Sequence, residues 1–283
     1  LIEQAKAGTD PLRRYHRLRK RLLGLDTYHS YDTAIPLVEF DRKYPYDNVV
    51  AGLPESVEAL GGDYQGEMSD LLNGQVIDVY EIPGKRSRAY SAPVYGCQPY
   101  MLLNYNDTLD AAFTLAHEMG HSMHTVLSHR SQPFVYAGYT IFVAEVPSTL
   151  SEALFLDYML ARTTDEHERI VLLQHAIDGI VTTFYTQVMF ADYELQAHRL
   201  VEEGKPVTAD VLGEIYFGLL QAYHGDALDY DEQSHVTWAR IPHFYSTPYY
   251  VYQYATCFAS TARLMQDIRP TDRGQSGEAV ERY

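Results

Sequence analysis

The sequence predicts a mainly α-helical fold with a small β-sheet, and three observations carry this prediction. Most of the chain shows apolar residues at helical spacing between capping residues, as in DPLRRYHRLRKRLLG at 10–24. Two short segments, QVIDVYE at 75–81 and PYMLLNYN at 99–106, are instead rich in branched and aromatic residues, with turn residues on both sides. The chain of 283 residues, 46% of them hydrophobic, can bury a large core.

The first helix is expected between Asp10 and Gly24. Asp10 can cap its N-terminus, Pro11 suits its first turn and Gly24 suits its end. Its six basic residues, from Arg13 to Arg21, are interpreted as a solvated helix face in a chain of formal charge −16. Because phosphate contacts need basic surface, this acidic balance argues against nucleic-acid binding.

The remaining elements follow from the same signals. Residues 43–75 are expected as short helical pieces, and GKRSRAYSAPVYG at 84–96, between the two strands, as a loop. Asp107 or Thr108 can cap a helix that runs to about Leu127. We expect further helices over 145–162, 165–203 and 208–223, and a last one capped by Thr247 with Pro248 in its first turn.

Cysteine content and apolar runs bear on the compartment. Cys97 and Cys257 are too few for a disulfide framework, so reduced thiols in the cytoplasm are expected. Because no uninterrupted apolar run is long enough to cross a bilayer, no membrane span is expected. The chain begins without methionine and ends abruptly, which suggests a piece of a longer protein.

The stretch TLAHEMGHSMH at 114–124 carries the candidate chemistry, because HEMGH fits the zinc motif H-E-x-x-H. Residues four apart lie one helical turn apart, so His117 and His121 can direct their imidazoles at one point. Glu118 is offset around the helix, where it can reach a water molecule without being a ligand. Gly120 costs about 1 kcal/mol relative to alanine inside a helix, which indicates a close approach of another element. The alternative is a helix with surface histidines.

The third metal ligand is less certain from spacing, since catalytic zinc usually takes three protein ligands and one water. A longer zinc motif with a histidine six positions after His121 is excluded, because Leu127 stands there. His124 lies on a similar face, but three ligands from one helix converge poorly, so a supporting or structural role is expected. Glu145 and Glu152 in the next predicted helix are better candidates. Spacing favours Glu145 and leaves Glu152 open, with the other glutamate free to hold a ligand histidine by its N–H.

Four motifs occur in a fixed order: KRSRAYSAP, then PYMLLNYNDTLDAAFTLAHEMGHSMH, FVAEVPSTLSEALF and RIPHFYSTPYYVYQYAT. Together they resemble the oligoendopeptidase F family, relatives of thimet oligopeptidase, over about 13–283. The resemblance implies a single zincin-like, mainly helical metallopeptidase catalytic domain over 1–283, with the small sheet beside the active-site helix. It also implies one zinc ion per chain held by His117, His121 and Glu145, with Glu118 as the catalytic base, and so decides for Glu145 over Glu152 as the third ligand.

The family is longer than this chain, and its N-terminal helical region forms one wall of a deep channel that restricts substrates to short peptides. That region and the extreme C-terminus have no counterpart in the sequence. The missing region or an oligomeric partner is therefore expected to complete the channel.

The tyrosine-rich segment HFYSTPYYVYQY at 243–254 is the second candidate for chemistry. Phenol groups are neutral donors at pH 7 and suit an oxyanion beside a metal, although aromatic packing is the ordinary alternative. The resemblance assigns His243, Tyr245 and Tyr252 to transition-state stabilisation and substrate binding. Tyr249 and Tyr250 are expected either to pack or to line the channel, with Tyr249 a candidate for substrate binding. The strand that contains Tyr105 is expected to pair with the substrate backbone.

Three functions fit this sequence. The first is a zinc endopeptidase that hydrolyses internal bonds of short peptides. A zinc carboxypeptidase would need a cation for the substrate's terminal carboxylate, and Arg240, close to His243, is the candidate. A non-catalytic, zinc-stabilised peptide-binding module would have no need of Glu118.

Overall fold

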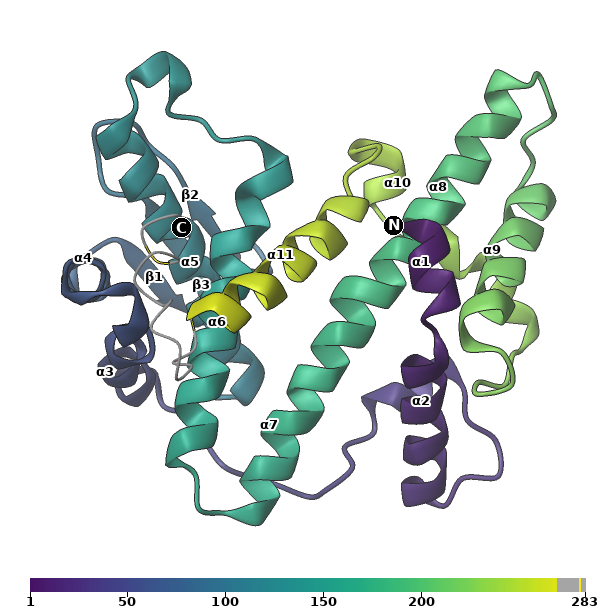
Figure 1. Cartoon of the computed structure of the whole chain (residues 1–283), viewed down its shortest axis with the longest axis horizontal. Coiled ribbons are helices and arrows are strands. Elements are labelled where there is room, and N and C mark those ends of the chain that lie inside the picture. The colour runs from purple at the N-terminus through teal and green to yellow at the C-terminus, as the bar shows by residue number, and fades with distance from the viewer. Residues whose placement is uncertain (269–279, 281–283) are drawn as a thin grey trace. The chain divides into compact units, whose positions relative to one another are not determined.

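The computed structural model describes residues 1–268 and 280, and it confirms a mainly helical chain with a small sheet (Figure 1). The chain divides into two compact units. The first unit comprises Leu1–Glu39 and Leu173–Thr256, and the second comprises Phe40–Leu172 and Cys257–Tyr283. A single catalytic domain over 1–283 stays a prediction, and each unit is described by itself.

The second unit contains the three-stranded sheet, in the order β1-β3-β2. β1 (Ile77–Tyr80) is parallel to β3 (Tyr100–Tyr105), and β2 (Tyr90–Ala92) is antiparallel to β3. Both predicted strands are confirmed, but β2 lies in the segment expected as a loop, which was wrong. A strand of three residues is too short to show an alternating pattern, and its pairing with β3 defines it. The helices of this unit are α3 (Tyr46–Ser56), η2 (Glu58–Leu60), α4 (Gly62–Asn73), α5 (Leu109–Ser131), η3 (Phe134–Tyr136), α6 (Ile141–Arg162) and the start of α7 (Glu166–Gly179).

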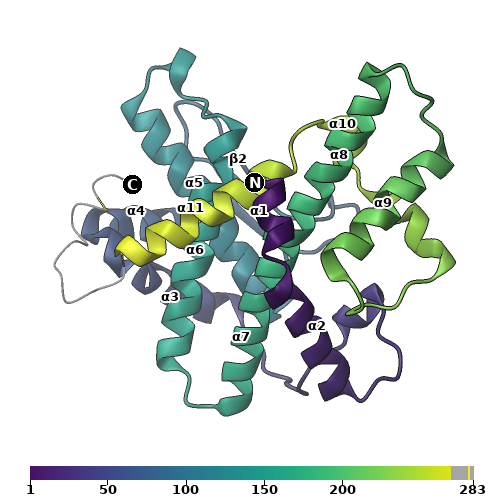
Figure 2. The same ribbon diagram turned by 45° about the vertical axis from the view of Figure 1, so that its right-hand side comes forward.

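The core of the second unit lies where α5 meets α6 and the sheet. α5 and α6 lie side by side in both ribbon views (Figures 1 and 2). Thr108 caps α5 as predicted, since its Oγ1 accepts the amide of Ala111 at 3.2 Å. Buried apolar side chains of this core come from the strand and both helices, among them Met101, Leu103, Leu115, Met119, Met123 and Leu150. This core packs α5 between α6 and the sheet.

The first unit is built from helices. α7 continues through a π-helical segment, η4 (Ile180–Tyr185), into α8 (Thr186–Glu202), which confirms the long helix predicted over 165–203. α9 (Ala209–His224) begins after Thr208, whose Oγ1 accepts the amide of Val211. The other elements are α1 (Ile2–Ala7), α2 (Asp10–Leu23), η1 (Ser30–Ala34), η5 (Glu232–Arg240), α10 (His243–Ser246) and the start of α11 (Tyr252–Ile268).

The start of the last helix was predicted wrongly. α11 begins at Tyr252, not after Thr247. The intervening Tyr249 has a φ of +60°, in the left-handed region, so the chain cannot continue as a right-handed helix through it. By contrast Gly24, with a φ of +65°, ends α2 as expected.

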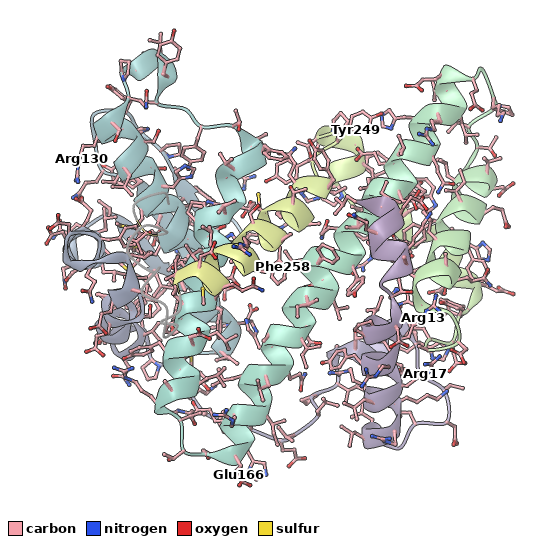
Figure 3. All side chains as sticks on the ribbon, viewed as in Figure 1. Arg13, Arg17, Arg130, Glu166, Tyr249 and Phe258 are labelled. Carbon is pink, nitrogen blue, oxygen red and sulfur yellow. The ribbon has the colours of Figure 1, made fainter. Side chains whose placement is uncertain are left out.

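The basic face of α2 is not simply solvated, which corrects the sequence interpretation. Arg19 is 0% exposed, and its guanidinium donates to the hydroxyl of Tyr28 and to the carbonyl of Thr33, both at 2.9 Å. Arg13 donates to the carbonyls of Ala222 and Tyr223 at the C-terminal end of α9 (Figure 3). A cation there is favoured by the helix dipole. The contacts of Arg13 fasten α2 to α9, and those of Arg19 fasten α2 to the segment that follows it.

Two expectations remain to be compared with the structure, the state of the cysteines and the membrane span. Neither Cys97, which is exposed, nor Cys257, which is buried, forms a disulfide. Cys257 instead donates its thiol to the carbonyl of Phe142 at 3.0 Å. None of the helices within the described residues is long and apolar enough to cross a membrane.

Two histidines are buried against each other in the first unit. His16 on α2 and His224 on α9 have ring centroids 5.1 Å apart. Among the described residues, neither ring nitrogen of His16 nor Nδ1 of His224 has a hydrogen-bond partner. Burial, aided by the charge of Arg19, lowers the pKa of His16 to about 4. Burial, aided by His16 and Arg13, lowers the pKa of His224 to about 3. Both rings are therefore neutral at pH 7.

We expect acid to destabilise the first unit through these histidines. Unfolded histidine titrates near 6.5, so below that pH the unfolded chain binds more protons than the folded chain. The stabilisation is full above pH 6.5. It is lost as the pH falls through about 4 for His16 and about 3 for His224, by on the order of 3 and 5 kcal/mol respectively. Urea unfolding at pH 7 and pH 5 should show a smaller loss of stability for His16→Phe than for the wild type. The exposed control His167→Phe should behave as the wild type; identical losses in all three proteins would refute this account.

Candidate metal centre

Three side chains converge in the second unit as a group able to hold a metal ion. His117 and His121 come from α5 and Glu145 from α6, and one ligand atom of each lies within 4.8 Å of the others. Oε2 of Glu145 lies 3.3 Å from Nε2 of each histidine, and the two Nε2 atoms are 3.1 Å apart. Two imidazoles and a carboxylate around one point are the donor set of many catalytic zinc sites. The donors therefore fit the ion that the sequence predicts.

The convergence depends on a backbone-to-backbone contact between α5 and α6. A Cβ added at Gly120 would lie 2.6 Å from Cα of Ser148 and 2.8 Å from the carbonyl carbon of Pro147. Only glycine fits that space, which confirms the close approach predicted from its position inside a helix. Because Gly120 lies between the two histidines in sequence, this contact brings the residues around Pro147, including Glu145, up to both imidazoles.

Two hydroxyl groups hold Glu145 in place. Ser148 Oγ lies 2.9 Å from Oε2 of Glu145 and can donate to it, and Thr149 Oγ1 donates to its carbonyl at 2.6 Å. Thr149 in turn lies 2.6 Å, hydroxyl to hydroxyl, from Thr261 on α11. Sequence reasoning missed these residues, although serine and threonine three or four positions after a helical residue commonly bond back to it.

Glu152 contacts one of the two histidines, and its role as support for a metal ligand stays a prediction. Its Oε1 lies 2.6 Å from Nδ1 of His117, the ring nitrogen that faces away from the ligand cluster. Such a carboxylate fixes the orientation and the tautomer of a ligand histidine. Burial lowers the pKa of His117, but hydrogen bonds to Glu145 and Glu152 outweigh it and hold that pKa well above the usual value. Burial would raise the pKa of Glu145, yet its bonds to both histidines hold it below the usual range.

Glu118 lies beside the ligands in a buried position. Glu118 is 7% exposed, and this burial raises the pKa of its carboxyl. The charges of His117 and His121 and a hydrogen bond from the backbone of Ser91 oppose that shift. Ser91 belongs to β2, and its hydroxyl lies 2.9 Å from that of Ser122 on α5. The edge of the sheet is thus attached to the helix that carries Glu118. A buried carboxylate of raised pKa can both accept and return a proton.

Two sequence candidates lie apart from the ligand group. His124 stacks on Tyr139 with ring centroids 3.7 Å apart, and burial lowers its pKa to about 4. Tyr105 is 4% exposed and donates its hydroxyl to the carbonyl of Tyr44 at 2.6 Å, so it fills the core instead of facing a substrate. Its strand, β3, is the central strand, and Met101 and Leu102 pair with both neighbours. At these two residues no edge is open to a substrate backbone, so the predicted pairing is wrong there. The edge strands of the described sheet are β1 and β2.

The C-terminal candidates belong to the first unit, so their roles at the metal centre stay predictions. His243 on α10 stacks with Tyr250 at 5.3 Å between ring centroids. Tyr245 is 64% exposed and donates its hydroxyl to the carbonyl of Ala239 at 3.3 Å. Tyr252 is the first residue of α11, Arg240 is exposed at the end of η5, and Tyr249 lies in the turn between α10 and α11.

Known proteins are similar to this chain in sequence and in fold. The chain matches peptidase family M3 over residues 1–281. It is 40% identical over 273 residues to the oligopeptidase PepF of Bacillus subtilis, covering 96% of this chain and 40% of that protein. It is 37% identical over 286 residues to an oligoendopeptidase F homolog of Borreliella burgdorferi, covering 100% and 48%. The crystal structure of oligoendopeptidase-F from Enterococcus faecium superposes with a TM-score of 0.70 at 29% identity, covering 100% of this chain and 42% of that one. The chain therefore spans less than half the length of these relatives.

Gly120→Ala is expected to separate α5 from α6. The added methyl would meet backbone atoms, which cannot rotate away, so the free energy of unfolding should fall by about 1–3 kcal/mol. Zinc affinity, measured by competition with a chelator, should fall with it. The control is Gly66→Ala in α4, where a Cβ meets nothing within 4 Å. That change should stabilise the chain by up to about 1 kcal/mol; equal effects of the two changes would contradict the close-packing argument.

Glu152→Gln is expected to weaken zinc binding without changing the ligand set. The substitution keeps the shape of the side chain but removes the charge that orients His117, and loss of such a partner costs about 10- to 100-fold in metal affinity. Glu58→Gln, an exposed change in the same unit, should leave the affinity unchanged. If both variants bind zinc as tightly as the wild type, Glu152 does not support the ligand.

Proposed function

Because this chain belongs to peptidase family M3, we propose that it is the catalytic part of a zinc-dependent endopeptidase that hydrolyses internal bonds of short peptides. The observation that carries the proposal is the convergence of His117, His121 and Glu145 beside the buried carboxylate of Glu118. The names of its relatives, oligopeptidase and oligoendopeptidase, support the substrate class. The content of reduced thiols favours a cytoplasmic location.

The three ligands would hold one zinc ion per chain. Their donor set suits zinc, and Glu152 gives the additional hydrogen bond that ligand histidines usually make. When bound, zinc supplies a Lewis acid that lowers the pKa of a water molecule towards about 7.

Glu118 is the proposed general base. It follows a ligand directly in sequence, so it lies next to the centre without belonging to the ligand group. Its carboxylate takes a proton from the attacking water and later gives it to the nitrogen of the departing amine. The raised pKa helps the second transfer, because a weaker acid holds its proton until the amine needs it.

The edge strand β2 is the proposed docking site for the peptide backbone. It pairs with β3 along one edge only in the described sheet, and it is attached to α5 through Ser91 and Ser122. An extended peptide added to such an edge gains main-chain hydrogen bonds whatever its side chains are. This geometry suits an enzyme for peptides of varied sequence.

The remaining roles rest on the sequence motif and on family membership. His243, Tyr245 and Tyr252 are the proposed donors to the oxyanion and to the substrate, and Tyr249 lines the substrate channel. Removing one oxyanion donor should reduce turnover on the order of 100- to 1000-fold. A carboxypeptidase that uses Arg240, or a module that only binds peptides, are the competing outcomes of the experiment below.

Zinc content and peptide cleavage, compared between the wild type and Glu118→Gln, test the proposal. We expect one zinc per chain in both proteins and cleavage of an internally quenched peptide blocked at both ends by the wild type. The variant should be about 100- to 10,000-fold slower, because it has no base. Cleavage of unblocked peptides alone would indicate a carboxypeptidase, and zinc with tight peptide binding but no turnover would indicate a binding module.

A further inference from the structure

The turn between α10 and α11 has a residue that is unfavourable there. The amide of Tyr250 donates to the carbonyl of Thr247 at 3.2 Å, which closes a four-residue turn with Pro248 in its second position. Tyr249, in the third position, has a φ of +60°. A type II turn has this pattern, and glycine or asparagine is usual in its third position. A tyrosine there is strained, so other contacts must hold it.

The carboxylate of Glu194 provides that contact. Glu194 lies on α8 and is 3% exposed, and its Oε1 accepts the backbone amide of Tyr249 at 2.7 Å. One helical turn further on, His198 faces the ring of Tyr249 with 4.6 Å between centroids. A charged acceptor makes a stronger hydrogen bond with an amide than a neutral one. α8 thus holds the strained residue by its backbone and by its ring.

The turn held in this way is part of an aromatic cluster that includes a proposed catalytic residue. Tyr250, next to the strained residue, stacks on His243 at 5.3 Å and contacts Tyr254 at 5.1 Å between centroids. Gln253 donates its side-chain amide to the carbonyl of Tyr249 at 3.1 Å. All of these residues lie in the first unit. A shift of the turn would therefore move His243 and the first turn of α11.

We propose that Glu194 is a positioning residue for the peptidase reaction: its carboxylate fixes the Thr247–Tyr250 turn and, through Tyr250, the orientation of His243. This inference rests on the proposed function, since His243 needs a substrate to act on. A misplacement of about 1 Å at a reacting group can cost 100-fold in rate, which is why a residue that only holds a turn can matter for turnover.

Substitutions of Glu194 separate positioning from simple stability. Glu194→Ala should lower kcat on the order of 10- to 100-fold with little change in KM, because the residue touches no substrate. Glu194→Gln keeps an oxygen acceptor for the amide and should recover most of the lost kcat. Glu202→Ala, an exposed glutamate on the same helix, should match the wild type. Unchanged kcat in Glu194→Ala, or Glu194→Gln as slow as Glu194→Ala, would overturn the proposal.

A second substitution tests the turn directly. Asparagine tolerates the left-handed conformation, so Tyr249→Asn lowers the need for the carboxylate. In the double variant Glu194→Ala with Tyr249→Asn, the loss of kcat should be smaller than the product of the two single losses. Simple multiplication of the losses would show that Glu194 does not act through the turn.

Hydrogen exchange gives a reading that does not depend on catalysis. The amide of Tyr249 should exchange slowly in the wild type and faster in Glu194→Ala, and unchanged exchange would overturn the proposal. A wild type that cleaves no peptide would refute the proposed function itself. A wild type that cleaves, together with Glu194→Ala that cleaves equally well, would refute only the positioning role.

Discussion

The contact of α5 with α6 at Gly120 is the constraint on which the metal centre depends. Side chains can adjust their rotamers, but two backbones in contact fix the distance between their helices. His117 and His121 are one turn apart on α5 and need a third ligand at the level of Gly120. The residues that meet Gly120 are Pro147 and Ser148, two and three positions after Glu145 in the chain. One missing Cβ therefore sets the spacing of all three ligands.

The charges around this contact suit a cation. Two carboxylates, Glu145 and Glu152, approach opposite nitrogens of one imidazole, His117. Buried charges are costly unless they are paired, so without an ion a proton on His117 has to compensate them. That arrangement explains why the pKa of His117 is raised while that of Glu145 is lowered. A bound cation would take the place of that proton, with Glu145 as the proposed ligand and Glu152 as the proposed partner of His117.

Local sequence signals predicted the elements that carry the centre, but not the contacts that complete it. The helical spacing of His117 and His121, the cap at Thr108 and the strands at 75–81 and 99–106 follow from nearest neighbours in the chain, and the structure confirms these elements. The choice of Glu145 over Glu152 depends on how two helices pack, which spacing does not reveal, so it required the family resemblance. Partners outside their own helix, strand or turn define β2, the turn at Tyr249 and the buried Arg19. Such partners leave no periodic pattern.

X-ray absorption spectroscopy of the zinc-loaded chain tests the central claim, a two-histidine, one-carboxylate centre, most directly. The account predicts one zinc per chain with two imidazole nitrogens at about 2.0–2.1 Å, oxygen ligands at about 2.0–2.2 Å and no sulfur. The imidazole contribution should fall to one ring in His121→Ala. A sulfur neighbour at about 2.3 Å, or a shell of oxygen atoms without imidazole scattering, would place the ion elsewhere and contradict the account.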